Sequence, residues 1–233
     1  LGFVYIGMVT HGSLLTMEKA KDLWEAGMDH ISISLNYIGQ GHDEERGIDG
    51  LYEHISNLVP QLTKQGINVI FNTVIMRDNL DHIVPIAHLA RSMGAKVSYS
   101  CYSDFKNGNE THLVDSTHTR ELEILIRDLI DLKSRLGNIV NSALYLRGIP
   151  TYFRKSLPRS CTAAGKWLVQ LTPDGNIKPC AELPVLSHYD DFKPVSKKID
   201  CDRCWYSCRG ETEASLKFER VWELLGRAWQ KGA

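Results

Sequence analysis

The sequence predicts an α/β fold in which about four strand–helix units form a partial parallel barrel, followed by a small cysteine-rich domain with a β-hairpin and a C-terminal helix. Two observations predict it. Apolar runs of strand length alternate with segments of helical period over the first hundred residues, and alternating units of this kind form parallel sheets with right-handed crossovers. Beyond them, five of the six cysteines fall between Cys161 and Cys208.

The first strand–helix unit begins with an apolar run at residues 3–9, which we expect to be a buried strand. Thr16 has the side chain of a helix N-cap and precedes a segment with one apolar face. Gly27 marks the end of that helix, because glycine readily adopts the left-handed conformation found after helix C-termini.

The next three units repeat this alternation. A polar loop is predicted at residues 36–47 between the second strand and its helix. Strands are expected at residues 31–35, 67–75 and 96–101, and helices at about 48–64 and from Leu80 to about Gly94.

Three helices are predicted after the fourth strand. Residues 104–118 form a polar connection, and residues 119–136 have the strongly amphipathic pattern of a surface helix. A shorter helix is expected at residues 139–155, broken near Gly148, and a last helix at residues 213–230.

The cysteine-rich stretch predicts a metal centre. Residues 167–171 read as a strand, and Thr172-Pro173-Asp174-Gly175 is a turn signal that folds the chain back. Cys180 can then approach Cys161, while the two-residue spacing of Cys201 and Cys204 places two thiolates on one metal. Cys208 is a fifth candidate ligand.

Three interpretations of these cysteines compete: a disulfide framework, a structural zinc site and an iron–sulfur cluster. The chain opens without a secretory signal pattern and carries the lone Cys101 besides, which disfavours disulfides. Cysteine-only ligation suits zinc and iron equally well, so spacing alone leaves both open.

The bulk composition narrows the class of protein. The 233 residues are 43% hydrophobic, which allows one large domain with an appendage. The net charge of −1 implies no basic face for nucleic acid, and no apolar run approaches the ~18 residues of a membrane span. We therefore expect a cytoplasmic protein.

Polar residues follow several of the predicted strands. Ligands of parallel sheets bind at the carboxyl ends of the strands. We therefore expect these residues to line one binding site at that end of the partial barrel. Each taken alone has a plainer explanation: His11 as a loop residue, Cys101 as a buried thiol. The residues are Thr10, His11, Gly12, Ser34, Asn36, Asn72, Thr73, Ser100 and Cys101.

The order of these motifs resembles the radical S-adenosylmethionine (SAM) superfamily. Three segments resemble sequence motifs of its (β/α)6-type barrel: I-S-I-S-L-N at residues 31–36, G-H-D-E-E-R-G at 41–47 and N-V-I-F-N-T-V-I at 68–75. C-x13-G-x4-C from Cys161 to Cys180, with Cys201-x2-Cys204, resembles the auxiliary-cluster domains called SPASM and twitch.

The resemblance implies a division at residues 1–136 for the partial barrel, 137–160 for a linker helix and 161–233 for the auxiliary-cluster domain. The C-x3-C-x2-C motif that binds the SAM cluster in this superfamily is absent from the sequence. We expect it in two further βα units preceding Leu1. The short C-x2-C-x3-C ending implies one auxiliary [4Fe–4S] cluster, held by Cys161, Cys180, Cys201 and Cys204, with Cys208 as a further candidate.

In such enzymes a reduced [4Fe–4S] cluster cleaves SAM to a 5′-deoxyadenosyl radical, which abstracts hydrogen from substrate. The resemblance implies that Ser34 and Asn72 hydrogen-bond SAM and that Arg46 pairs with its carboxylate. The plainer alternative for Arg46 is a surface ion pair with Asp43 or Glu44, while Asp43 and Glu45 order the loop or are solvated.

The implied partners are a peptide or small-metabolite substrate and an electron donor such as flavodoxin or ferredoxin. The alternative function is a non-catalytic α/β binding module with a structural zinc-ribbon-like site of four cysteines.

Overall fold

The computed structural model describes residues 3–155, 157, 160–192 and 199–214. The chain divides into two compact units. Unit 1 comprises residues 1–100 and 121–140, and unit 2 comprises residues 101–120 and 141–233.

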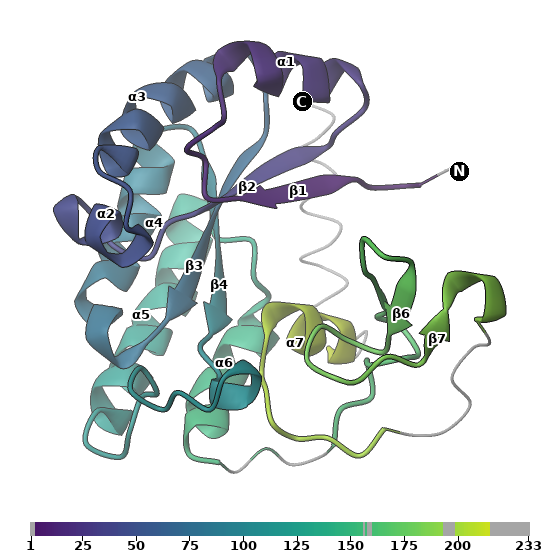
Figure 1. Cartoon of the computed structure of the whole chain (residues 1–233). Helices are drawn as coiled ribbons and strands as arrows, with labels where there is room; N and C mark the ends of the chain where they lie inside the picture. The colour runs from purple at the N-terminus through teal and green to yellow at the C-terminus, as the bar shows by residue number, and fades with distance from the viewer. Residues whose placement is uncertain (1–2, 156, 158–159, 193–198, 215–233) are drawn as a thin grey trace. The chain divides into compact units, whose positions relative to one another are not determined.

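Unit 1 is built on a four-stranded sheet with the strand order β1-β2-β3-β4 (Figure 1). β1 pairs in parallel with β2, and β2 pairs in parallel with β3, with Ser34 opposite Asn72. The predicted α/β fold is confirmed. The strands are β1 (Gly7–Thr10), β2 (His30–Ser34), β3 (Val69–Ile75) and β4 (Lys96–Cys101).

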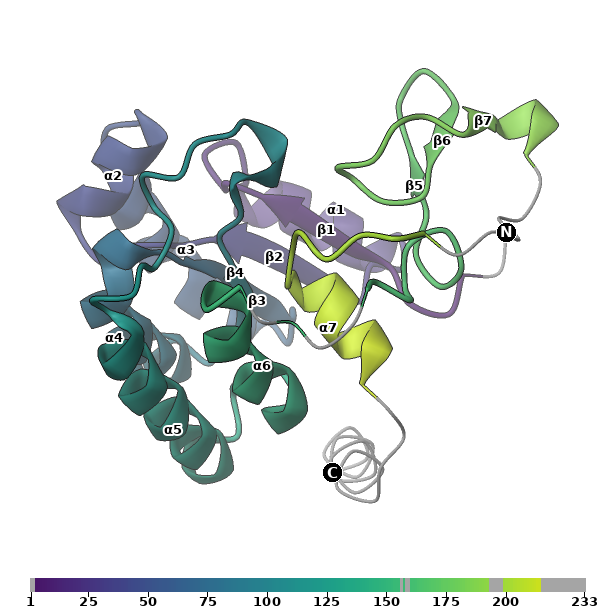
Figure 2. The ribbon, with the colours of Figure 1, turned by 90° about the horizontal axis from the view of Figure 1, so that it is seen from below.

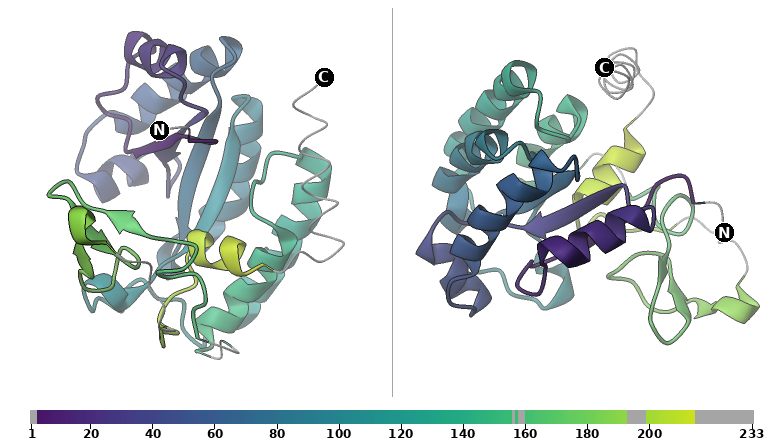
Figure 3. Two further views of the ribbon diagram at one scale, coloured as in Figure 1. Left: turned by 90° about the vertical axis from the view of Figure 1, so that its right-hand side faces the viewer. Right: turned by 90° about the horizontal axis from the view of Figure 1, so that it is seen from above.

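Helices cover one face of this sheet. Figure 1 shows α3, α4 and α5 along it, and the right-hand view of Figure 3 shows the purple α1 beside α3. Thr16 caps α1 as predicted, since its hydroxyl accepts a hydrogen bond from the Lys19 amide at 3.2 Å. The helices are α1 (Met17–Glu25), α2 (Gln40–Arg46), α3 (Leu51–Lys64), α4 (Leu80–Ser92) and α5 (Thr119–Leu136).

The core of unit 1 follows the predicted periodicity. β2 and β3 bury the side chains of Ile31, Ile33 and Phe71 completely. α3 buries Ile55 and Val59 on its apolar face. Burial of this kind contributes roughly 1.5–3 kcal/mol for each large aliphatic side chain.

Two predictions for unit 1 are wrong. The segment 36–47 is not only loop, because α2 forms inside it between two glycines in the left-handed region, Gly39 and Gly47. The run 3–9 is not buried: Val4 is 97% and Val9 66% exposed. Within the described residues β1 is one of the two edge strands of the sheet, with a strand partner on one side.

Unit 2 combines two helices with a small antiparallel sheet (Figure 2). The predicted hairpin is present as β5 and β6, and β7 adds a third strand that the sequence did not indicate. Most of the helix predicted at 213–230 lies outside the described residues. The elements are α6 (Ala143–Phe153), β5 (Gln170–Leu171), β6 (Asn176–Lys178), β7 (Ser187–His188) and α7 (Ser207–Glu213), with 3-10 turns at Asp104–Lys106 and Tyr189–Asp191.

The break predicted at Gly148 does not occur, since α6 runs through it from its Ser142 cap. Gly148 instead makes room for an aromatic ring. A Cβ at this position would lie 2.5 Å from the ring of Trp205. That ring stacks on Tyr145 with centroids 5.9 Å apart, and its Nε1 donates to the Tyr145 carbonyl oxygen at 3.1 Å. The lack of a side chain at Gly148 therefore fixes the chain just after Cys204.

Within the described ranges, no helix combines the length and the apolar character that crossing a bilayer requires.

We predict that Gly148→Ala lowers the free energy of unfolding by roughly 1–3 kcal/mol, because the added methyl group overpacks a ring that is held on two sides. Gly41→Ala is the matched control. Its Cβ would meet nothing closer than 3.6 Å in α2, so alanine there should be neutral or stabilising by up to ~1 kcal/mol. Urea unfolding measures both, and equal effects would contradict the packing assigned to Gly148.

Candidate functional site

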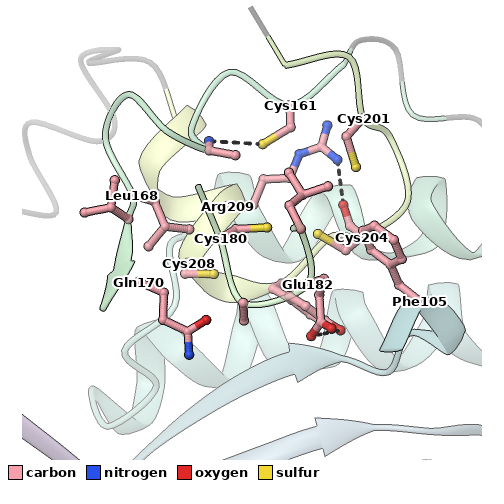
Figure 4. Close-up of a pocket in the computed structure, with 15 residues that line it drawn as sticks. Phe105, Cys161, Leu168, Gln170, Cys180, Glu182, Cys201, Cys204, Cys208 and Arg209 are labelled. Atoms are coloured by element: carbon pink, nitrogen blue, oxygen red, sulfur yellow. Dashed lines mark hydrogen bonds between the residues drawn. The ribbon is translucent and has the colours of Figure 1, made fainter. Parts of the chain in front are cut away.

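Five cysteines of unit 2 line one cavity of about 260 Å³. Figure 4 shows their sulfur atoms around a common space. Phe105, Tyr206 and Arg209 complete part of its wall. The structure thus brings together the cysteines that the sequence singled out, and their role as ligands stays a prediction. They are Cys161, Cys180, Cys201, Cys204 and Cys208.

The hairpin brings Cys180 to Cys161. Its turn closes because Gly175, at φ 81°, donates its amide to the Thr172 carbonyl oxygen at 2.9 Å. The Gly165 amide then donates to the Pro179 carbonyl oxygen at 2.9 Å, which ties the segment after Cys161 to the residue before Cys180.

Backbone contacts also hold the third segment in place. The Cys161 amide donates to the Cys201 carbonyl oxygen at 2.6 Å. The thiol of Cys161 accepts from the Ala164 amide at 3.4 Å, drawn as a dashed line in Figure 4. Cys161 and Ala164 are buried, and Cys180 and Cys201 pack against them.

A buried arginine that the sequence analysis did not single out lies beside the cysteines. Arg209 is only 2% exposed, and its Nη1 donates to the Cys204 carbonyl oxygen at 2.7 Å. Its Nε lies 3.4 Å from Glu213 Oε2, while Glu213 Oε1 accepts from the amide and hydroxyl of Thr162. The spacing of Arg209 and Glu213, four residues apart, is the one sequence signal that could have indicated this pair.

Burial controls the protonation of the thiols in this cavity. It raises the pKa of Cys204 to about 12, against a smaller opposing effect of the Arg209 charge. Burial also raises the pKa of Cys208. A metal binds the thiolate and releases the proton, so these groups would lose their protons when a metal enters.

The donor set and the space both fit a polynuclear metal group. Thiolates select zinc, copper(I) and iron–sulfur clusters among biological metals. The cavity has several times the ~30 Å³ that one water molecule occupies in the liquid, which is more than a single ion fills.

The sixth cysteine does not line the cavity. Cys101 is 1% exposed, and its sulfur lies 3.8 Å from the Tyr145 hydroxyl oxygen. Burial raises the pKa of this thiol as well. Cys101 is therefore the buried thiol that its apolar setting suggested. His11 is an exposed loop residue, whose Nδ1 accepts from the Ser13 amide at 3.3 Å.

Two of the residues expected to contact SAM face each other across strands of unit 1. Ser34 on β2 and Asn72 on β3 are paired in register, and both are half-buried. Their side chains therefore lie on the same face of the sheet.

Arg46, the third expected SAM contact, has a different partner from the two that the sequence suggested. Its Nε lies 3.2 Å from Glu45 Oε2, so the surface pair with Asp43 or Glu44 is wrong. Glu45 Oε1 accepts from the Asn36 amide nitrogen at 2.6 Å, which links Arg46 to the end of β2. Asp43 orders the loop as expected, since it accepts from the amides of Gly50 and Tyr52.

His42 lies beneath this network and is fully buried. Burial lowers the pKa of His42 to about 4, so the ring is neutral at pH 7. Among the residues that the structure describes, its two ring nitrogens find no hydrogen-bond partner, and Nδ1 lies 3.7 Å from Glu45 Oε2. The sequence analysis placed His42 in a polar loop and did not anticipate its burial.

Comparison of the sequence with protein-family models finds no match. Among characterised proteins, the chain is similar to PqqA peptide cyclase of Methylobacterium nodulans, with 26% identity over 183 residues. That match covers 76% of this chain and 46% of the relative. PqqA peptide cyclase of Gluconobacter oxydans is 24% identical, with 76% of this chain and 49% of the relative covered. The chain spans about half the length of the curated relatives it matches.

Solved structures share the fold. Streptococcus suis SuiB bound to S-adenosylmethionine aligns with a TM-score of 0.54 and 14% identity, covering 81% of this chain and 46% of SuiB. SuiB bound to its precursor peptide SuiA aligns with a TM-score of 0.55 and 15% identity, covering 78% of this chain and 44% of SuiB. Native anSMEcpe with bound AdoMet and the Cp18Cys peptide aligns with a TM-score of 0.61 and 16% identity, covering 95% of this chain and 72% of anSMEcpe. The resemblance to the radical SAM superfamily is confirmed.

We predict that iodoacetamide at pH 8 leaves Cys101 and Cys204 unmodified in the folded, metal-free chain. The thiolate is the reacting form, and a thiol with a pKa near 12 is deprotonated in only about one molecule in ten thousand at this pH. Peptide mass mapping measures the label, and the chain unfolded in guanidinium is the control, in which all six cysteines should react. Equal labelling of Cys204 in the folded and unfolded chains would contradict the burial assigned to it.

Proposed function

We propose that this chain is part of a radical SAM enzyme that modifies a peptide, with one auxiliary [4Fe–4S] cluster in the cysteine cavity. The observation that carries the proposal is the convergence of thiols from three separate segments on one cavity. It occurs in a chain whose sequence and fold are similar to radical SAM enzymes.

Cys161, Cys180, Cys201 and Cys204 are the proposed ligands, which is the set that closes a four-iron site. The bound cluster supplies one-electron redox chemistry near the substrate. The protein's own part is to hold the thiols, which it does through the amides of Cys161 and Gly165, and to limit water with Phe105 and Tyr206. Cys208 also faces the cavity and is the alternative fourth ligand.

Ser34, Asn72 and Arg46 are the proposed SAM contacts of unit 1. The hydroxyl and amide of Ser34 and Asn72 can hydrogen-bond polar groups of SAM from one face of the sheet. Arg46 can pair with the SAM carboxylate through its guanidinium, and Glu45 holds its side chain in place.

A peptide is the proposed substrate because two lines of comparison agree. The relatives are named for cyclising the peptide PqqA, and the similar structures include SuiB bound to a precursor peptide. A flavodoxin- or ferredoxin-type protein in the cytoplasm is the proposed electron donor. The second candidate function, a zinc-binding module, rests on the same cysteines, and the following experiment separates the two.

We predict that anaerobic reconstitution with iron and sulfide gives a brown chain with about four iron and four sulfide per protein. Single alanine variants of Cys161, Cys180, Cys201 and Cys204 should lose most of the iron, because each removes a ligand. Cys101→Ala is the matched control and should keep it, since Cys101 does not line the cavity.

Metal analysis and the visible spectrum measure the outcome. Cys208→Ala tells whether the four-cysteine set is sufficient: retention of the cluster supports it, and loss assigns Cys208 to the ligand set. A colourless protein with one zinc per chain would instead support the zinc-binding module and overturn the cluster.

A further inference from the structure

We propose that Arg209 sets the charge balance of the cysteine cavity, so that the buried guanidinium favours the reduced form of the bound cluster. Arg209 is a positioning residue in this proposal, since it acts on the thiolates and not on the substrate. The inference rests on the proposed function, because it concerns the cluster assigned to this cavity.

The first step in the argument is where the two charges of the ion pair lie. Arg209 lines the cavity together with the five cysteines, whereas Glu213 is absent from its lining. The Glu213 carboxylate accepts instead from the amide and hydroxyl of Thr162. Of this pair, the positive side chain is therefore the one that borders the space shared by the thiols.

The second step is burial. Arg209 is 2% exposed, so water and salt screen its charge far less than that of a surface arginine. An arginine side chain contributes a positive charge on a planar group with several N–H donors. Because the effective dielectric around it is low, the positive charge of Arg209 acts on all the thiolates that would line the cavity.

The third step is the charge that the cavity receives. Four thiolates carry more negative charge than an iron–sulfur core neutralises, and one-electron reduction adds a further negative charge. The potential of such clusters depends on net charge, hydrogen bonds to sulfur and exposure to solvent. A fixed cation beside the thiolates stabilises the reduced form more than the oxidised form, and so raises the reduction potential.

Arg209 also fixes the position of one ligand. Its Nη1 donates to the Cys204 carbonyl oxygen at 2.7 Å, which orients the segment between Cys201 and Cys204. A purely structural arginine would do this too. The two roles separate in variants that change the charge of the pair from opposite ends.

Two variants of the reconstituted 233-residue chain test the proposal by dithionite titration followed by electron paramagnetic resonance. Arg209→Met removes the positive end, and at a fixed solution potential the ratio of reduced to oxidised cluster should fall by about tenfold. Glu213→Gln keeps the shape but removes the negative end, so the ratio should rise. Arg209→Lys keeps the charge and should stay close to the unmodified chain.

Lys166→Met is the matched control. Lys166 lies on the segment between Cys161 and Cys180, is exposed, and does not line the cavity. Its removal should leave the ratio within twofold.

Opposite shifts in Arg209→Met and Glu213→Gln support the proposal. Shifts in the same direction, or no shift in Glu213→Gln, overturn it and leave Arg209 a structural role. If Arg209→Met fails to bind iron, Glu213→Gln decides alone. Failure of the unmodified chain to bind iron overturns the proposed function itself, and is thus distinguishable.

Discussion

The cysteine cavity depends on backbone hydrogen bonds that hold three distant segments of chain together. Thiols are weak hydrogen-bonding groups, so they cannot organise one another before a metal binds. The amides of Cys161 and Gly165 do so instead, by donating to the carbonyl oxygens of Cys201 and of Pro179, the residue before Cys180. Because the scaffold is formed by the chain itself, the thiols are preorganised, and the ordering entropy that a metal must otherwise overcome is reduced.

The buried pair of Arg209 and Glu213 extends this scaffold. A buried ion pair adds little to stability on its own, because desolvation of both charges offsets their attraction. Its presence therefore calls for another explanation, and its surroundings supply one. The pair joins Thr162, next to Cys161, to the carbonyl group of Cys204, so it connects two of the cysteine-bearing segments through charge-assisted hydrogen bonds.

The elements that sequence analysis predicts well are those with a long, regular pattern. The helix at residues 119–136 and the strand at 96–101 have the boundaries expected, because many apolar positions contribute to each. α2 was missed because its residues are nearly all polar, and two glycines, not a hydrophobic period, determine its ends. Gly148 was read as a helix breaker, since its actual role depends on Trp205, which lies far along the chain. Arg209 was missed for the same reason: a charged residue looks solvated until its partners are known.

The fifth cysteine bears on how the cavity can work. Cys161 and Cys201 are pinned by a backbone hydrogen bond, and Cys204 is fixed through its own carbonyl group by Arg209. Cys208 lies on the first turn of α7, where its carbonyl oxygen accepts from the Thr212 hydroxyl at 2.6 Å. It lines the same cavity but is the most exposed of the five cysteines. Rigid thiols suit permanent ligation, because ligand geometry is then set before the metal arrives. Because Cys208 is carried by α7 and not by the hairpin, its ligation would place one ligand of the proposed cluster on a separate element. In the proposed cluster, the choice between a closed and an open iron site would therefore depend on whether this one side chain is a ligand.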